Sequence, residues 1–253
     1  MATFFGEVLS VYSRAVEEDE YDDQCDENEE DQQILRELEE KRSVDVQWLL
    51  KSVTGPMPCS DLIIATGPNA TGFLSACVLG SGGWRPIAWF CLWNERSRGT
   101  ERPSKAPAPG EPSCMLYQQE TQPTVLICQC QCYLAEDQLF QWTEKVFSCV
   151  QSRDLTVTLL SDCAVSEYKS SEYLSDSSVP FLRCLKTDKH SKPQLCPALE
   201  PPNICTGAAA AVLSHCQVHQ ISAVLFLGYT EGLHTDSRSM GMYAAPLSSL
   251  LKV

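Results

Sequence analysis

The 253-residue sequence contains no run of about 18 apolar residues, so no transmembrane helix is expected. The first twenty residues, MATFFGEVLSVYSRAVEEDE, lack a basic stretch and turn acidic where a signal peptide would be cleaved. A secretory signal is therefore not expected either. The sequon formed by Asn69, Ala70 and Thr71 is then incidental, because N-glycosylation takes place in the secretory lumen.

The sequence also lacks a basic excess, since 33 Asp and Glu stand against 19 Lys and Arg, for a formal net charge of -14. The acidity is concentrated at one end. Residues 1–42 hold fifteen acids and four bases, a net charge of -11, whereas the remaining 211 residues hold eighteen and fifteen, a net charge of -3. A nucleic-acid-binding protein would need a basic face, so this function class is excluded.

Cysteine is abundant, with fourteen residues, and Cys128, Cys130 and Cys132 alternate in the stretch VLICQCQCYLAED. In one extended strand the outer two would lie about 13 Å apart. Zinc–thiolate bonds are only about 2.3 Å long, so one strand cannot easily bring all three thiols to one ion. Leu126 shares their face, and no second Cys or His pair completes a site. We therefore predict that the cysteines are free packing residues rather than a metal or redox site.

The chain divides by composition into an acidic N-terminal segment, residues 1–43, and a folded region, residues 44–253. Residues 17–31, EEDEYDDQCDENEED, are too acidic to bury an apolar surface, so the segment is expected to be largely disordered. The sequence QQILRELEEKR that follows has a helical pattern. Three long loops are expected in the folded region, at residues 94–113, 164–178 and 188–203.

Strongly apolar strands alternate with helical patterns in the folded region, which predicts a single α/β domain. Its sheet should be mostly buried, with helices on both faces. Strands are expected within 44–50, 61–67, 87–93, 114–119, 124–133, 155–160 and 221–230, and helices within 69–80, 135–150, 207–219 and 239–253, the last interrupted near Pro246.

Two of the expected helices have a predicted orientation. The helix within 69–80 should begin at an N-cap, Asn69 or Thr71. Its apolar face would comprise Phe73, Ala76, Cys77 and Gly80. The helix within 135–150 should bury one face, which comprises Leu139, Trp142, Val146 and Phe147.

Three short patterns share features with known sites of chemistry. His215 and His219 have the i, i+4 spacing of metal-binding helices, but the general-base Glu of an H-E-x-x-H motif is absent, which favours surface or capping histidines. The turn GPNATG, residues 67–72, lacks the Lys of a phosphate-binding loop. The turn GYTEG has Thr230 where a nucleophile elbow has Ser. No catalytic, cofactor-binding or metal-binding residue is predicted.

Several long strings occur together in one order, which makes a family resemblance specific. They are ATFFGEV at 2–8, LWNE at 92–95, CQCQCYLAEDQLFQWTEKVF at 128–147 and AAVLSHCQVHQISAVLFLGYT at 210–230. PCSDLIIATG, PFLRCLKT and PPNI fit between them. The sequence resembles the proteasome assembly chaperone 1 family from residue 2 to about residue 230, with a poorer match beyond.

The resemblance implies a non-catalytic chaperone without a cofactor. Such a chaperone forms a heterodimer with proteasome assembly chaperone 2 and binds α subunits of the 20S core, notably alpha-5 and alpha-7. It promotes α-ring formation and prevents off-pathway α-ring dimerisation. A cytoplasmic location is implied, with the nucleus and the surface of the endoplasmic reticulum as further sites. The alternative that stays open is a small-molecule-binding α/β protein or enzyme.

Two terminal segments are candidate partner-binding sites. Phe4 and Phe5 could anchor an arm on an acidic spacer of about 28 residues, which as a flexible coil reaches roughly 30 Å. An alternative of equal standing is that these residues form a frayed terminus or an added edge strand. Relatives of this family in other lineages end in a hydrophobic residue, Tyr and any residue. This sequence ends in Leu251, Lys252 and Val253, with Lys in the place of Tyr. The apolar elements at 135–150 and 210–230 could also leave a patch for the partner chaperone.

Overall fold

The computed structural model describes residues 29–49, 55–92, 107, 111, 113–151, 153–170, 178–232 and 234–248. The chain divides into two units, residues 1–41 and 42–253, and the boundary predicted at residue 43 stays a prediction. The helix α2 (Glu29–Arg42), which was predicted from QQILRELEEKR, lies almost wholly in the first unit. Within the described residues no helix is long and apolar enough to cross a membrane.

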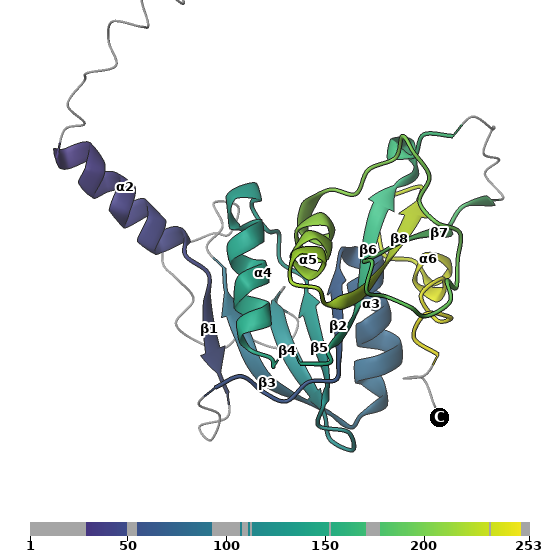
Figure 1. Cartoon of the computed structure of the whole chain (residues 1–253), viewed down its shortest axis with the longest axis horizontal. Helices are drawn as coiled ribbons and strands as arrows, with labels where there is room; N and C mark the ends of the chain where they lie inside the picture. The colour runs from purple at the N-terminus through teal and green to yellow at the C-terminus, as the bar shows by residue number, and fades with distance from the viewer. Residues whose placement is uncertain are drawn as a thin grey trace, which may run out of the picture. The chain divides into compact units, whose positions relative to one another are not determined.

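The second unit contains one mixed eight-stranded sheet with the strand order β1-β3-β4-β5-β2-β6-β8-β7 (Figure 1). The central strands β5, β2, β6 and β8 are parallel, and the remaining pairs are antiparallel. The strand bounds are Asp45–Trp48 (β1), Asp61–Thr66 (β2), Trp84–Cys91 (β3), Cys114–Gln119 (β4), Val125–Cys130 (β5), Thr156–Ala164 (β6), Phe181–Lys186 (β7) and Ser222–Thr230 (β8).

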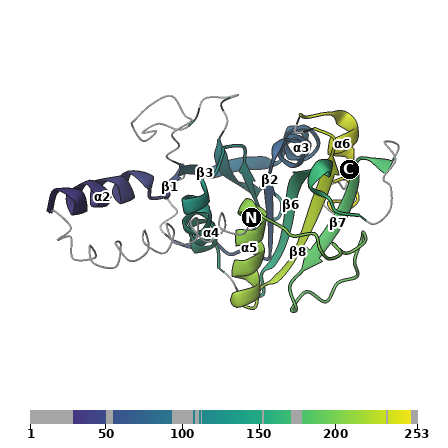
Figure 2. The same ribbon diagram turned by 90° about the horizontal axis from the view of Figure 1, so that it is seen from above.

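Helices cover both faces of the sheet, because the central strands are apolar on both sides. In β2, Leu62 and Ile64 face α4 (Leu139–Ser148) and α5 (Gly207–Val218). Ile63 and Ala65 face the layer of α3 (Pro68–Phe73) and α6 (Ser237–Gly241). Figure 2 shows the two helix pairs on opposite sides of the sheet. The predicted fold class, an α/β domain with a central sheet flanked by helices, is confirmed.

The prediction for α4 holds, because Trp142, Val146 and Phe147 are buried on its inner side and Leu139 is half-buried. The apolar face predicted for the helix within 69–80 is wrong. Phe73 and Val78 are buried there, whereas Ala76 and Cys77 are exposed. Residues 74–78 form a π-helical turn. Such a turn inserts a residue into the helical repeat and rotates the following side chains away from the expected face.

Two further differences concern the second half of the chain. The strand β7 was not predicted, and it forms one edge of the sheet beside β8. The expected helix within 239–253 is short, since α6 ends at Gly241 and turns continue to Ser248. Asp236 starts α6 because its Oδ1 accepts the backbone N–H groups of Arg238 and Ser239, each at 2.9 Å.

The Pro-rich loop at 188–203 is tied to the sheet edge. The N–H of Cys184 donates to the carbonyl of Pro197, and that of Leu199 donates to the carbonyl of Cys184, both at 2.9 Å. Arg183 also pairs with Glu200 at 3.2 Å. These contacts cover part of the β7 edge, which would otherwise present free backbone groups to other chains. Of the other two predicted loops, only part lies within the described residues.

Candidate functional site

Open α/β sheets bind ligands beyond the carboxyl ends of their parallel strands, so this end of β2, β6 and β8 is the first place to search. The turn from β2 into α3 is the GPNATG motif. Gly67 is the N-cap, with φ of 91°, and Pro68 occupies the first helical turn. The N-cap predicted at Asn69 or Thr71 is therefore wrong, because both residues lie inside α3. Thr71 instead donates its hydroxyl to the carbonyl of Gly67 at 2.7 Å.

The N-terminus of α3 is capped by a carboxylate from another strand. Asp162, near the end of β6, accepts the N–H of Asn69 at 2.5 Å and that of Ala70 at 3.3 Å through Oδ2. A Cβ on Gly67 would lie 2.8 Å from the same oxygen. The position where a bound phosphate would meet the helix N-terminus is thus filled by the chain's own carboxyl group.

Tyr243 closes the same end of the sheet from the segment after α6. Its hydroxyl lies 2.6 Å from Oδ1 of Asp162 and 2.7 Å from the carbonyl oxygen of Ser161. A Tyr hydroxyl has one hydrogen, so both contacts are complete hydrogen bonds when Asp162 carries a proton and donates it to Tyr243. Burial raises the pKa of Asp162, and the hydrogen bonds from Tyr243, Asn69 and Ala70 oppose this shift.

The remaining motif at this end, GYTEG, does not present its Thr230 as a nucleophile elbow presents Ser. Thr230 is 1% exposed, and its hydroxyl donates to the carbonyl of Gly232 at 2.8 Å. Gly228 is required by packing, because a Cβ there would collide with Met242 and with the hydroxyl of Tyr243. The interpretation of GYTEG as a plain turn is wrong for its first three residues, which belong to β8, and Thr230 is not placed as a nucleophile.

His215 and His219 form an aromatic stack on the α4–α5 layer. The His215 ring lies 4.3 Å from the Phe147 ring and 4.2 Å from the His219 ring, centre to centre. His219 is also the C-cap of α5, in accord with the expectation of a surface or capping histidine. Burial, and next the neighbouring His219, lower the pKa of His215. No group of three potential metal ligands occurs in the part of the chain that the structure describes.

The alternating cysteines lie in the core under α4. Cys128 and Cys130 are buried on β5, whereas β5 ends at Cys130 and Cys132 lies beyond it. Cys114 on β4 lies opposite Cys130, and its sulfur accepts the indole N–H of Trp142 at 3.3 Å. The hydrogen bond with Cys114, followed by burial, raises the pKa of Cys130, which disfavours the thiolate that a metal needs. These contacts support the packing interpretation.

We expect the substitution Cys128→Ala to lower the free energy of unfolding by about 1 kcal/mol, because it removes a small buried apolar group. Metal analysis of the purified chain should find no stoichiometric zinc, and a chelator should leave the melting temperature unchanged. The exposed Cys77 provides the matched control, since Cys77→Ala should have little effect on stability. Zinc that is bound by the parent and lost from Cys128→Ala would contradict the packing interpretation.

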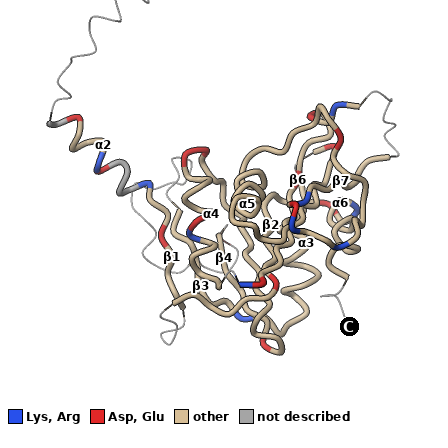
Figure 3. The backbone as a smooth tube through the Cα atoms, viewed as in Figure 1, with Lys and Arg blue, Asp and Glu red and all other residues tan. Residues whose placement is uncertain are grey.

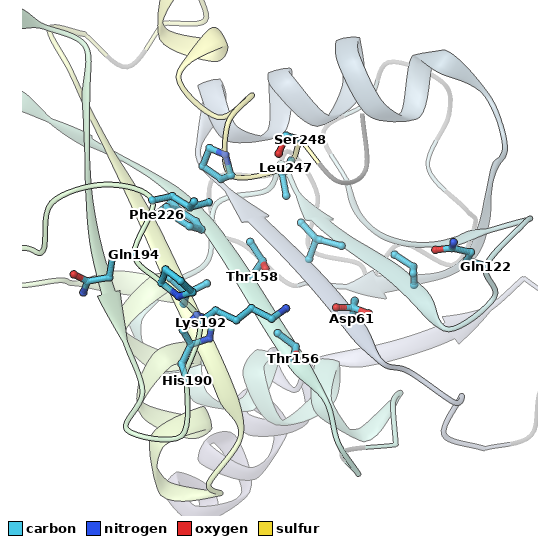
Figure 4. A pocket seen from close by; sticks show the side chains of 16 residues that line it. Asp61, Gln122, Thr156, Thr158, His190, Lys192, Gln194, Phe226, Leu247 and Ser248 are labelled. Carbon is cyan, nitrogen blue, oxygen red and sulfur yellow. The ribbon is translucent and has the colours of Figure 1, made fainter. Parts of the chain in front are cut away.

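An open groove lies on the α3–α6 face of the sheet, toward the amino ends of β2, β6 and β8 (Figure 4). Its volume is about 540 Å³. The floor is made by side chains of the sheet, among them Ile63, Val125, Val224 and Phe226. One wall is residues 192–195 of the Pro-rich loop, and the other is residues 246–248 after α6. Sequence reasoning missed this site, because the loop and the strands that form it are far apart in the chain.

Large apolar side chains are exposed on the α4–α5 side. Phe140 in the first turn of α4 is 64% exposed and Ile204, just before α5, is 75% exposed. The ring of Phe147, near the end of α4, stacks on the ring of His215, near the end of α5, and the two helices lie side by side and run in the same direction. Phe140 and Ile204 therefore lie near the same end of this layer. Figure 3 shows α5 without charged residues. Phe4, Phe5, Leu251, Lys252 and Val253, the residues predicted to bind partners, lie outside the described residues.

Comparison with known proteins gives a consistent result along the whole chain. The PAC1 family model, described as "Proteasome assembly chaperone 4", matches residues 1–253. The chain is 68% identical to proteasome assembly chaperone 1 of Danio rerio, over 100% of this chain and 91% of that protein. It is 40% identical to the Homo sapiens protein of the same name, over 98% and 88%. The likeness therefore extends past residue 230, where the sequence strings had suggested that it fades.

Two archaeal structures from Pyrococcus furiosus share the fold. PbaA, an archaeal homolog of proteasome-assembly chaperone, has a TM-score of 0.58 and 13% identity over 83% of this chain and 86% of PbaA. PbaB, an archaeal proteasome activator, has a TM-score of 0.57 and 12% identity over 84% and 90%. At such identities the comparison concerns the fold alone. The matches over its full length show that the chain belongs to the PAC1 family of proteasome assembly chaperones.

Proposed function

We propose that the chain is an assembly chaperone for the 20S proteasome that works as a heterodimer with proteasome assembly chaperone 2. It binds α subunits, notably alpha-5 and alpha-7, promotes α-ring formation and prevents off-pathway α-ring dimerisation. It acts in the cytoplasm, and also in the nucleus or at the surface of the endoplasmic reticulum. The observation that carries the proposal is the full-length match to the family.

The geometry of the sheet supports a binding protein over an enzyme. The carboxyl end of the parallel strands, where an α/β enzyme binds its ligand, is occupied by Asp162, Tyr243 and the α3 N-terminus. Thr230 is buried there. These contacts do not favour the alternative of a small-molecule-binding protein or enzyme, whereas the exposed Phe140 and Ile204 suit an interface.

Phe4 and Phe5 are proposed to contact the α subunits. The C-terminal Leu251, Lys252 and Val253 are a second proposed contact, without the Tyr found in the tail of relatives in other lineages. We expect tagged full-length chain, mixed with the purified partner chaperone and α subunits, to retain both. Substitution of Phe4 and Phe5 by Ala should weaken α-subunit capture and leave the heterodimer intact, because aromatic anchors carry much of the binding energy at interfaces.

The matched control replaces Ser10 and Ser13, two polar residues of the same segment, by Ala. Capture of α subunits by the Phe4 and Phe5 variant at the level of the parent would refute the arm. Recovery of the parent as a bare monomer, with neither partner retained, would refute the proposed function as a whole.

A further inference from the structure

We propose that Cys184 and Cys196 are a redox modification site, at which a peroxide converts the two thiols into an intrachain disulfide. The disulfide would tie the Pro-rich loop at 188–203 to the edge strand β7 (Figure 2). The pair is separate from the buried cysteines of β4 and β5. The inference goes beyond the proposed function and does not depend on it.

The backbone brings the two cysteines side by side. Cys184, on β7, forms a parallel bridge with Ala198 of the loop. The N–H of Cys184 donates to the carbonyl of Pro197, and the carbonyl of Cys184 accepts the N–H of Leu199, both at 2.9 Å. Cys196 lies two residues before this bridge, so the bridge limits its distance from Cys184.

The two side chains are also in contact. The thiol of Cys184 donates to the backbone carbonyl of Cys196 at 3.2 Å, and a further hydrogen bond joins the two thiols. A disulfide needs a sulfur–sulfur distance of about 2.05 Å and α-carbons less than about 7 Å apart. Thiols that already contact each other need only a short movement to reach the sulfur–sulfur distance.

The two thiols differ in their exposure to solvent. Cys196 is half-buried in the loop, whereas Cys184 is 1% exposed beneath it. An oxidant from solvent therefore meets Cys196 first. Cys184 then has the position of the resolving thiol, the one that converts an oxidised cysteine into a disulfide.

Oxidation would proceed in two steps. The thiolate of Cys196 attacks one oxygen of hydrogen peroxide, so that the S–O bond forms, the O–O bond breaks, and hydroxide leaves and takes up the proton of the thiol as water. The sulfur of Cys184 then displaces the hydroxyl group of the Cys196 sulfenic acid, which leaves as a second water with the proton of Cys184. The two thiols together lose two electrons and two protons, and one peroxide becomes two waters.

The thiol of Cys196 is protonated at neutral pH. Burial, and next the neighbouring Cys184, raise the pKa of Cys196 to about 12, and Arg183 opposes this shift. Because the thiolate is the form that attacks a peroxide, the pair stays reduced at rest and the disulfide forms slowly. The rate of formation should increase about tenfold for each pH unit between about pH 7 and pH 9, since the thiolate fraction increases by that factor.

The test exposes the full-length chain to hydrogen peroxide, blocks the remaining thiols with iodoacetamide and maps disulfides by mass spectrometry after digestion with trypsin. Trypsin releases Cys184 as the one cysteine of residues 184–186, and Cys196 within residues 190–238. We expect these two peptides to be linked before treatment with a reductant and separate after it. The oxidised chain should also melt about 5 °C higher, because the disulfide restricts the unfolded chain.

Cys205→Ser is the matched control, because Cys205 is another half-buried thiol of the same tryptic peptide and lies beside the carbonyl of Thr206. This variant should keep the linked peptides and the rise in melting temperature, whereas Cys196→Ser should lose both. The exposed Cys77 reports whether the oxidant was effective. Absence of the linked peptides under conditions that oxidise Cys77, or a link to residues 184–186 that persists in Cys196→Ser, would overturn the proposed site.

Discussion

Replacement of Asp162 by Ala should destabilise the domain strongly. The carboxyl group accepts the N–H groups of Asn69 and Ala70 at the start of α3 and contacts the hydroxyl of Tyr243. Its removal leaves buried donors without partners and opens a cavity between α3 and the segment after α6. Loss of a cap together with unsatisfied buried groups amounts to about 3 kcal/mol of unfolding free energy. Chemical denaturation of the two proteins measures this difference.

Asp162→Asn is the matched control, because an amide reproduces the hydrogen-bonding pattern of a protonated carboxyl. Its oxygen can accept from Asn69 and Ala70, and its NH₂ can donate to Tyr243, which then donates to Ser161. We expect Asp162→Asn to stay within about 1 kcal/mol of the parent. A loss as large as that of Asp162→Ala would mean that the charged carboxylate is the native form.

The pH dependence follows from the same group. Burial raises the pKa of Asp162 in the folded chain above its ordinary value of 3.8, so between the two pKa values the folded state holds a proton that the unfolded state releases. The stability of the parent relative to Asp162→Asn should therefore be greatest below pH 3.8 and fall as the pH rises through the folded pKa. The nearest titratable neighbour, Tyr243, has a pKa raised by burial and then by Asp162, so it stays protonated over this range.

Elements with a local hydrophobic pattern could be predicted from the sequence. The run Leu62–Ala65 is apolar without interruption, as expected for a strand covered on both faces, and Trp142, Val146 and Phe147 repeat at helical spacing. The sequence was insufficient for β7, where Arg183 and Lys186 interrupt the apolar residues of an edge strand. It also missed the π-helical turn at 74–78, which side-chain periodicity cannot reveal.

The contacts that fill the carboxyl end of the parallel strands could not be predicted, because the residues that make them come from distant parts of the chain. Asp162 lies 93 residues from Asn69, and Tyr243 lies 81 residues from Asp162. Gly67, Gly228 and Tyr243 look unrelated in the sequence, yet the two glycines are needed at the close contacts with Asp162 and Tyr243. The groove has the same origin, since its floor and its walls belong to separate strands and loops.

The second large effect concerns the assembly of α rings. A heterodimer that scaffolds α subunits should raise the amount of single α rings formed from purified α subunits and reduce the amount of paired rings. The physical reason is mass action, because binding of the chaperone to the single ring stabilises that species over its dimer. The controls are the partner chaperone alone and the partner chaperone mixed with heat-unfolded chain.

The most direct test of a role in α-ring assembly is therefore the ratio of single to paired α rings. This ratio is counted by electron microscopy with and without the heterodimer of full-length chain and proteasome assembly chaperone 2. We predict a several-fold rise in this ratio, with this chain present in the single-ring fraction. An unchanged ratio, with the chain absent from every ring fraction, would contradict a role in proteasome α-ring assembly.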